Sequence, residues 1–516
     1  MRPVSDDLER APGPAHEVQQ SGRARRGTPL LLAGLMLLLL AWAGGQPPGA
    51  APDEAAHLVK GIGLTNGQLR GDATTARPPR GDTFLAGYAR AYEVPGSYEF
   101  PSSPPCYKAS AARSARCLAV DPGGVRSPQD RSGAVLGKEP PGRAVSYVSP
   151  YPPAPYLLPG IFGRWGGDAR THFLLGRIGQ VLSVLALLAL ALRRSTAMER
   201  LGLLLALTPM SLFLMGSVNP SGLSVAAALT LVAAGLRLAR APSRIDAVAV
   251  VLAGTVLSFS RPEGPLLTVA AAATVLGLAG VRRRMAVVGA LLAAAVLGGL
   301  AWTLLLLPRL SGVAGGGDGG SLRSSVRDSV KGLFELTREL VGLFGWQDVV
   351  LPLPLPLLWL AALLLLLLLA LAVGTWRERL VLLALCASVP AAVVVEQALL
   401  LDPIGATMQA RYVLPLAVLV PVAAGWVLAR SPMGDRALEA VAAAAVILAG
   451  VHVLALWVDG RRYATGTDGS LLTWPFTAQW TPLGGWAPWL ACALAGGALV
   501  AWSFVRAWSD SRVTAR

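Results

Sequence analysis

The sequence TPLLLAGLMLLLLAWAGGQ at residues 28–46, followed by GAAPDEAAHLVK at residues 49–60, decides the fold. The first stretch is almost uninterrupted apolar sequence and is long enough to cross a bilayer as one helix. Since a basic segment precedes it, it could also be a signal peptide. The many later apolar segments and the lack of a convincing small-residue cleavage site favour a retained helix. The second stretch then lies at a membrane surface.

That second stretch brings carboxylates and an imidazole to the surface. Pro52 can open a short helix, and residues four or seven positions apart share a helical face. Asp53, His57 and Lys60 are therefore expected on one face, with Glu54 beside them. A carboxylate in this set could act as the catalytic base of a membrane enzyme. Alternatively, the two acids merely complement the positive N-terminal end of the helix.

Composition excludes an ordinary soluble protein. The 516 residues are 53% hydrophobic and 15% charged, which is typical of a polytopic membrane protein. The net charge of +15 could suggest nucleic acid, but the arginines lie at the ends of apolar segments and not on a groove-reading face. Membrane lipids are expected partners, and nucleic acid is not.

Eleven further apolar segments predict an all-α integral membrane protein of about twelve transmembrane helices. They lie near residues 173–192, 199–217, 220–236, 245–260, 263–280, 285–307, 354–374, 380–400, 411–428, 437–457 and 486–505. Arginine-rich loops alternate with loops that carry few arginines. The positive-inside rule then predicts a multi-pass plasma-membrane protein with both termini in the cytoplasm.

The predicted organisation follows from these segments. It comprises a disordered cytoplasmic tail (1–27), a first helix (28–46), a long extracytoplasmic loop (47–172), helices two to seven (173–307), a second outward loop (308–353), helices eight to twelve (354–505) and a cytoplasmic tail (506–516). In the second loop, leucines and valines recur at helical spacing over 321–345. This spacing predicts an amphipathic helix on the outer surface.

The long first loop contains two further features. Cys106 and Cys117 are expected to form a disulfide if the loop faces an oxidising compartment. The stretch YVSPYPPAPYLLP at 147–159 is stiffened by proline and presents Tyr151 and Tyr156, together with Tyr147, at the membrane interface. These tyrosines either line a substrate site or belong to an aromatic belt.

Charged residues near the outer ends of helices form a second set of candidates. Arg177, Arg261 and Arg411 could face a cavity and bind phosphate, or could reach the lipid headgroups. Arg261 could also be neutralised by Glu263. Asp348 could face the same cavity or cap the next helix.

Several of these stretches, in this order, are similar to those of the DUF2142 family of bacterial polytopic membrane proteins, which is common in actinobacteria. They are PDEAAH at 52–57, the cysteine pair, YPPAPYLLPG at 151–160, TPMSLFLMGSVNPSGL at 208–223, SRPEGP at 260–265, FGWQDVVLPLP at 344–354 and QARYVLPL at 409–416. The family often has an acidic residue in or just after the NPSG element, where this chain has Ser221 and Ser224.

The family in turn resembles GT-C glycosyltransferases, which take sugars from polyprenyl-phosphate donors outside the cytoplasm. The resemblance implies that an acid in the first outward loop is catalytic, so Asp53 is the expected base and Glu54 the second choice. The acceptor would be an envelope glycan, lipid or protein. The expected substrate-binding residues are His57, Lys60, Tyr151, Tyr156, Arg177, Arg261, Asp348 and Arg411.

Three alternatives stay open. His57 could join a divalent metal, although the chain has four histidines and no ligand spacing. The protein could instead be a transporter or flippase of lipid-linked envelope precursors, with Arg177 and Glu396 on the path, although no clear internal repeat is visible. It could also be a non-catalytic scaffold, in which case the acids of the first loop would be dispensable.

Overall fold

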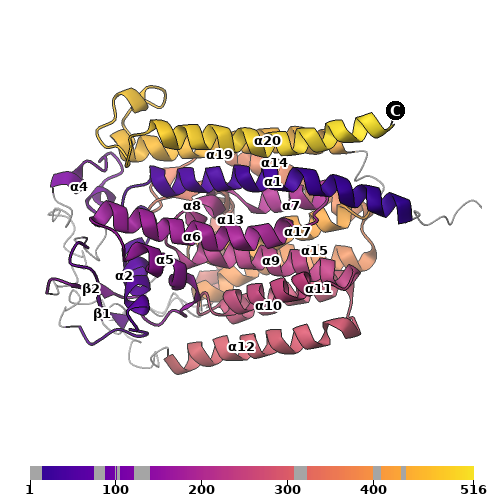
Figure 1. Cartoon of the computed structure of the whole chain (residues 1–516), viewed down its shortest axis with the longest axis horizontal. Helices are drawn as coiled ribbons and strands as arrows, with labels where there is room; N and C mark the ends of the chain where they lie inside the picture. Colours follow the sequence, from indigo (N-terminus) through magenta and orange to yellow (C-terminus); the bar gives the residue numbers. More distant parts are fainter. Residues whose placement is uncertain are drawn as a thin grey trace, which may run out of the picture.

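The computed structural model describes residues 14–74, 88–98, 100, 105–120, 140–306, 322–398, 408–431 and 437–515. Long helices lie side by side along one axis, and short elements gather at one end (Figure 1). We call that end, which carries the predicted first loop, the loop end. The described residues are mostly helical, as predicted.

Within the described residues, nine helices are long and apolar enough to cross a membrane. These spans lie in α1 (Pro14–Gly45), α6 (Ala169–Leu192), α9 (Pro220–Arg240), α12 (Ala286–Leu306), α14 (Pro354–Val373), α15 (Trp376–Glu396), the continuous pair α16 (Ala410–Ala417) and α17 (Leu419–Leu428), α19 (Leu438–Thr465) and α20 (Ala487–Ala515). A pair bent by 73°, α7 (Ala197–Ala206) and α8 (Pro209–Met215), would make a tenth. The structure therefore supports a multi-pass membrane protein.

The predicted count of about twelve spans is not reached by this criterion. The two other predicted segments form α10 (Arg244–Ser258) of 15 residues and α11 (Gly264–Ala279) of 16 residues. Both are shorter than the roughly 17 residues that a spanning helix normally needs. An apolar segment in the sequence includes turn residues at its ends, and the helix inside it is shorter.

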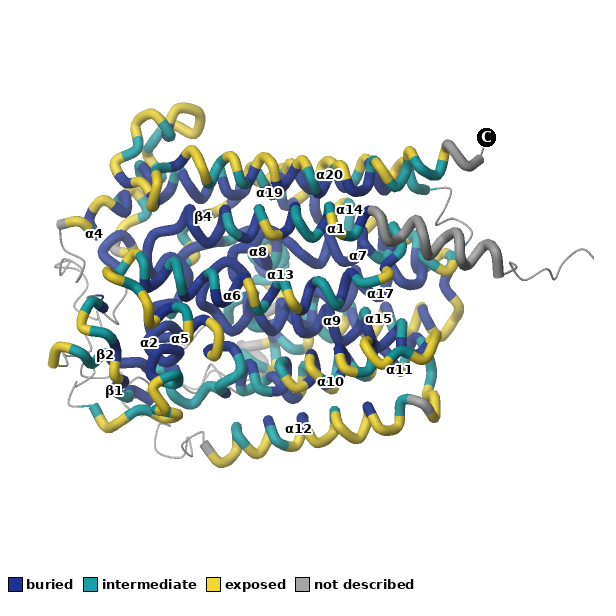
Figure 2. Tube along the Cα trace, viewed as in Figure 1, coloured by how far each residue is buried: buried dark blue, intermediate teal, exposed yellow. Residues whose placement is uncertain are grey.

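The helix α9 forms the centre of the bundle and is buried along nearly its whole length (Figure 2). Pro220 occupies its first turn, where a missing N–H costs nothing, and the side chain of Asn219 accepts a hydrogen bond from the amide of Ser221. Asn219 and Pro220 therefore fix the start of this central helix. By contrast, α12 and α14 expose most of their apolar surface.

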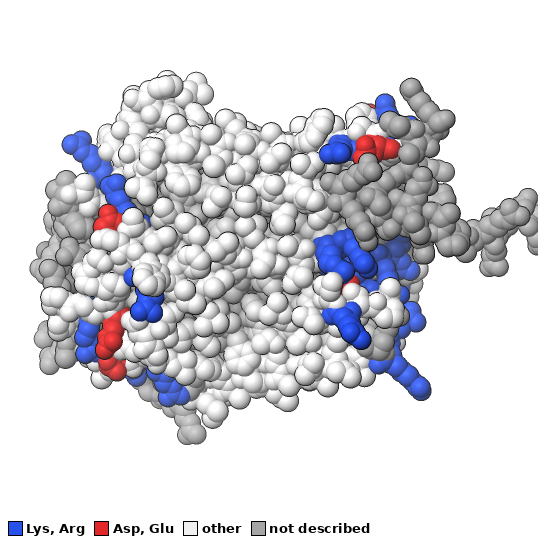
Figure 3. All heavy atoms as spheres, in the orientation of Figure 1, with Lys and Arg blue, Asp and Glu red and all other residues white. Residues whose placement is uncertain are grey.

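Charge is distributed as a bilayer requires. On the face shown in Figure 3, lysine, arginine, aspartate and glutamate gather at the two ends, and a broad uncharged belt separates them. At the end opposite the loop end, Arg237 donates to Asp246 and to the carbonyls of Leu190 and Ala191. The belt is the surface that acyl chains would cover.

The first loop folds into a small layer at the loop end. It contains α2 (Glu54–Thr65), β1 (Arg90–Glu93), η1 (Cys106–Ala109), α4 (Cys117–Val120), β2 (Arg143–Ser146), η2 (Ala154–Tyr156) and α5 (Leu157–Gly163). The strands pair antiparallel, with Arg90 opposite Ser146 and Glu93 opposite Arg143. A disulfide joins Cys106 to Cys117.

Three predicted segments differ from the structure. Helix α1 begins at Pro14 and α20 continues to Ala515, so most of both predicted tails is helical where it is described; residues 1–13 and 516 lie outside the described part. The amphipathic segment forms α13 (Leu322–Gly342), followed by the strands β3 (Leu343–Phe344) and β4 (Val349–Val350). One side of α13 packs against α8, α15 and α16, while Val330 and Phe334 are 56% and 60% exposed. The difference therefore lies in where the helix ends, and its position on the outer surface stays a prediction.

Candidate functional site

The candidate site is built around Asp53, the residue immediately before α2. Its backbone is left-handed, with φ 65°, a conformation that costs a non-glycine residue roughly 1–2 kcal/mol and that aspartate tolerates better than most. Pro52 precedes it and α2 starts directly after it. This strained junction turns the Asp53 carboxylate away from the helix that it would otherwise cap, and its side chain makes no cap hydrogen bond.

Two donors hold the Asp53 carboxylate. The hydroxyl of Tyr147 donates to Oδ1 at 2.7 Å, and Arg411 Nη2 donates to Oδ2 at 2.8 Å. Burial raises the pKa of Asp53, but the charge of Arg411 and the hydrogen bond from Tyr147 lower it, and the pKa lies below the ordinary value. The side chain still exposes 27% of its surface. Asp53 is therefore an ionised carboxylate that a substrate can reach.

Two guanidinium groups face the same tyrosine ring beside this carboxylate. The Cζ atoms of Arg261 and Arg411 lie 4.8 and 5.2 Å from the centroid of the Tyr412 ring. Arg261 also donates to the Ser221 hydroxyl at 2.7 Å and pairs with Glu263. The buried Nε of Arg411 has no hydrogen-bond partner among the described residues. Guanidinium groups in this arrangement suit a phosphate group.

His57 lies on the same side of α2 as Asp53. Its Nδ1 is 2.9 Å from the hydroxyl of Tyr156, and its ring stacks on that tyrosine with centroids 5.7 Å apart. Tyr151 packs against the other edge at 5.7 Å. Burial lowers the pKa of His57 to about 3 despite the attraction of Asp53, so the imidazole is neutral at physiological pH.

Lys60 has a structural role instead of the expected substrate-binding one. Its ammonium group donates to the carbonyls of Val148, Ser149 and Tyr151 and is 1% exposed. Because an ammonium group has three donors, nothing remains for a ligand. Lys60 instead fixes the segment that presents Tyr147 and Tyr151. The expectation that Asp53, His57 and Lys60 share a face fits this arrangement, because all three contact residues 147–156.

Glu54 and Arg177 form a second pair that is closed to substrate. The carboxylate accepts from Arg177 Nε at 2.8 Å and Nη2 at 2.7 Å, and from the amide of Val218 at 3.0 Å. Arg177 also donates to three carbonyls at the end of α1, those of Ala43, Gln46 and Pro47. The side chains are 0% and 2% exposed. This corrects the assignment of Glu54 as an alternative base and of Arg177 as a substrate ligand.

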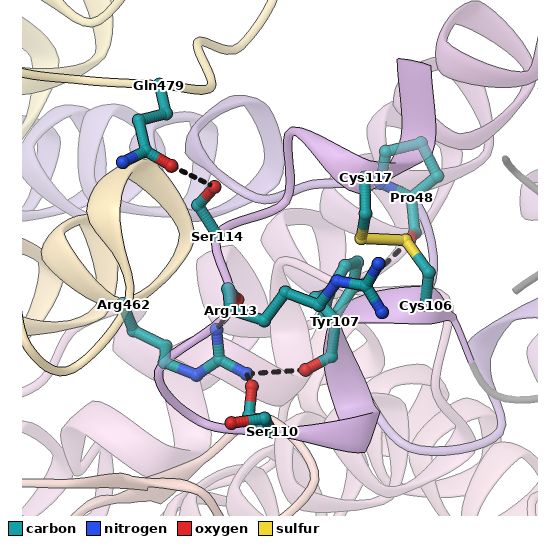
Figure 4. Close-up of a disulfide and its surroundings, with 9 residues drawn as sticks. All are labelled: Pro48, Cys106, Tyr107, Ser110, Arg113, Ser114, Cys117, Arg462 and Gln479. Atoms are coloured by element: carbon teal, nitrogen blue, oxygen red, sulfur yellow. Dashed lines mark hydrogen bonds between the residues drawn. A yellow bond between two sulfur atoms is a disulfide. The ribbon is translucent and has the colours of Figure 1, made fainter. Parts of the chain in front are cut away.

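Asp348 likewise pairs with an arginine inside the protein and is not part of the site. Arg462 near the end of α19 donates to Asp348 at 2.8 Å and to the carbonyls of Tyr107, Ser110 and Arg113. Figure 4 shows this arginine reaching into the loop closed by the disulfide. Asp348 and Arg462 thus join the first loop, the β3–β4 turn and α19.

The structure gathers six of the ten predicted catalytic and substrate-binding residues around the Asp53 carboxylate and its arginines, and bonds the other four to partners within the protein. The six are Asp53, His57, Tyr151, Tyr156, Arg261 and Arg411, and the four are Glu54, Lys60, Arg177 and Asp348. The expected catalytic and substrate-binding residues do not include Tyr147, Ser221, Glu263 and Tyr412, which also lie in this cluster. Tyr412 follows Arg411 directly, and Tyr147 begins the proline-rich stretch, so both had a signal in the sequence.

The described residues do not fit a metal ion. They contain no group of three or more His, Cys, Asp or Glu side chains placed to hold one. The groups closest to Asp53 are instead a guanidinium, a phenol and a neutral imidazole. A cationic site of this kind would compete with a metal for the same anion.

Comparison with known proteins places the chain in a family. No curated protein and no solved structure matches it. A family model described as a predicted membrane protein (DUF2142) matches residues 36–420, which include the site and most of the bundle. The chain therefore belongs to the DUF2142 family of predicted membrane proteins.

Proposed function

We propose that the protein is a membrane glycosyltransferase that moves a sugar from a polyprenyl-phosphate donor to a cell-envelope acceptor. The observation that carries this proposal is the partly exposed, ionised Asp53 carboxylate beside the guanidinium groups of Arg411 and Arg261. In the proposed topology α7 with α8, α10 and α11 complete twelve spans of the plasma membrane. Both termini are then cytoplasmic, and the loop end faces outward.

The chemistry follows from the charges. Asp53 accepts the proton of the acceptor hydroxyl as that oxygen attacks the anomeric carbon of the sugar. The bond between that carbon and the phosphate oxygen breaks, and both electrons leave with the phosphate. Arg411 and Arg261 stabilise the departing anion. Asp53 then carries the proton, and Tyr147 and Arg411 hold its carboxyl group in position.

The remaining groups orient the substrates. Neutral His57 and the rings of Tyr151 and Tyr156 form an apolar wall with polar edges. Tyr151 is the partly exposed member of this wall, so a sugar ring would pack against Tyr151, and the buried His57 and Tyr156 support it from behind. Ser221 and Glu263 fix the Arg261 guanidinium. The serine thus occupies the place of the acidic residue that the family often has here, and its hydroxyl supports the arginine.

The contacts of Arg177 weaken the transporter alternative, in which Arg177 and Glu396 would line the transport path. Arg177 is bonded to Glu54 and to three carbonyls and does not face a path. Glu396, the other path residue, is partly exposed at the last position of α15. A transporter would need transport to depend on Glu396 more than on Asp53.

The test is transfer of radiolabelled sugar from a panel of polyprenyl-phosphate donors by purified protein in lipid. Wild type is compared with Asp53→Asn and with Asp72→Asn, a matched control because Asp72 lies in the same loop and pairs with Arg143 at its exposed surface. Turnover that disappears only in Asp53→Asn supports the proposal. No turnover with any donor, from folded protein, contradicts it.

A further inference from the structure

The segment 466–486, which we call the tryptophan cap, connects α19 to α20 at the loop end. Three buried tryptophans form its base: the rings of Trp474 and Trp486 lie 4.7 Å apart and those of Trp480 and Trp486 lie 5.7 Å apart. Trp457 of α19 packs on Trp474 at 5.1 Å. The cap is therefore a packed element and not an open loop.

Hydrogen bonds fasten this base to the first loop. The amide of Thr467 donates to the carbonyl of Ala111 at 3.0 Å, and the hydroxyl of Ser114 donates to Gln479 at 2.9 Å (Figure 4). Ala111 and Ser114 lie between the two cysteines of the disulfide. The cap is thus held at two points by a covalently closed loop.

From this rigid base, large apolar side chains project outward. Phe476 is 90% exposed and Leu472 is 79% exposed, and Leu483 and Leu471 are 50% and 40% exposed. The base prevents these side chains from folding inward, so their exposed surface is available to whatever lies beside the bundle.

We propose that the tip of the cap, Leu471, Leu472, Phe476 and Leu483, inserts into the interfacial region of the lipid bilayer beside α19 and α20. Figure 1 shows the cap projecting sideways from these two helices, across the bundle axis. Its surface continues the exposed apolar faces of α19 and α20, which carry Leu454, Leu494 and Trp502. The occupant is therefore the same lipid that surrounds those helices.

The charge of the cap defines the kind of lipid interaction. Asp468 is the only charged residue within 466–486, and no lysine or arginine lies there. Attraction to anionic headgroups therefore contributes nothing, and insertion depends on apolar contact alone. The same insertion is expected in zwitterionic and in anionic membranes.

The experiment is site-directed spin labelling in vesicles. Phe476→Cys and Leu472→Cys are made in full-length protein with Cys386→Ala and Cys492→Ala, which remove the free cysteines. Asp468→Cys, on the same loop, is the aqueous control, and Leu454→Cys on α19 is the lipid control. Collision rates with oxygen and with a nickel chelate are measured in phosphatidylcholine vesicles and again with phosphatidylglycerol added.

The expected ratio of oxygen to nickel collisions is above one at 472 and 476, between the two controls, and unchanged by phosphatidylglycerol. A ratio equal to that at 468 places the tip in water and overturns the proposal. Low rates with both probes mean that protein, such as a second copy, covers the tip, and this also overturns it. Both tip positions are so exposed that substitution should not disturb packing, and either one alone decides the result.

Discussion

Two neighbouring acids, Asp53 and Glu54, each pair with an arginine that is distant in sequence, yet the two pairs differ in every property that matters for function. Glu54 and Arg177 are 0% and 2% exposed, whereas Asp53 and Arg411 are 27% and 6% exposed. Glu54 and Arg177 make their hydrogen bonds with each other and with other groups inside the protein. The Asp53 pair leaves carboxylate surface accessible, and one arginine nitrogen has no hydrogen-bond partner in the part of the chain that the structure describes.

The direction of the side chain separates the two pairs. Asp53 precedes α2 in a left-handed conformation, and Glu54 is the first residue of the helix itself. One residue of helix advance turns Glu54 toward α6, while Asp53 faces α16 and the 147–156 segment. Adjacent acids at a helix N-terminus therefore have different surroundings: Glu54 joins helices inside the protein, and Asp53 keeps an accessible carboxylate surface.

The largest expected effect comes from breaking the closed pair. Glu54→Gln leaves the Arg177 charge buried without a counter-charge, which costs about 3–5 kcal/mol. Purified protein should be scarce, with an apparent melting temperature well below that of wild type. Glu54→Gln combined with Arg177→Met removes both charges and should recover part of the yield, but not all, since three carbonyls lose their donor. A normal melting temperature in Glu54→Gln would contradict the structural role.

Breaking the open pair should instead affect turnover alone. Asp53→Asn removes the base, and loss of a general base typically costs about 10²–10⁴-fold in rate. The amide can still accept from one donor, and the site is partly exposed, so the melting temperature should change little. Sugar transfer and thermal unfolding are measured on the same preparation. An Asp53→Asn variant that unfolds like Glu54→Gln would show that the pairs are alike.

A smaller effect is expected at the second arginine of the open site. Arg261→Lys keeps the charge but loses the planar fork and the stacking on Tyr412, and we expect about a tenfold fall in kcat/KM for the donor, ~1.4 kcal/mol. Arg170→Lys, at an exposed position near the start of α6, is the control. Unchanged kinetics in Arg261→Lys would mean that this arginine only neutralises Glu263.

The sequence was sufficient for the class of fold, for most helix positions and for part of the site. The length of an apolar segment predicts a transmembrane helix, because the thickness of the bilayer determines that length. The family motifs pointed to Asp53, Arg261 and Arg411. The number of spans was not predictable, since α10 and α11 end within their apolar segments. The ion-pair and hydrogen-bond partners of the charged side chains were not predictable either. Glu54 and Arg177 are 123 positions apart, and nothing local distinguishes an arginine that binds ligand from one that binds carbonyls.

A pH dependence of stability due to His57 is expected to be of similar size to the effect at Arg261. Its pKa is about 3 in the folded protein and about 6.5 in an unfolded chain. Between these values the unfolded state binds a proton that the folded state excludes, so stability is complete above about pH 6.5 and falls as pH decreases. At pH 5.5 the loss is roughly 1.4 kcal/mol. Between pH 5.5 and 7.5 the Asp53 carboxyl, whose folded pKa is lowered, is ionised in both the folded and the unfolded chain and adds no slope.

The measurement is the difference in apparent melting temperature between pH 7.5 and pH 5.5, in wild type and in His57→Gln. The glutamine can keep a hydrogen bond to Tyr156 but does not titrate, so its difference should be smaller than that of wild type. The other histidines are present in both proteins and cancel in the comparison. Equal differences would mean that His57 is protonated in the folded protein, and the wall beside Asp53 would then be cationic and not neutral.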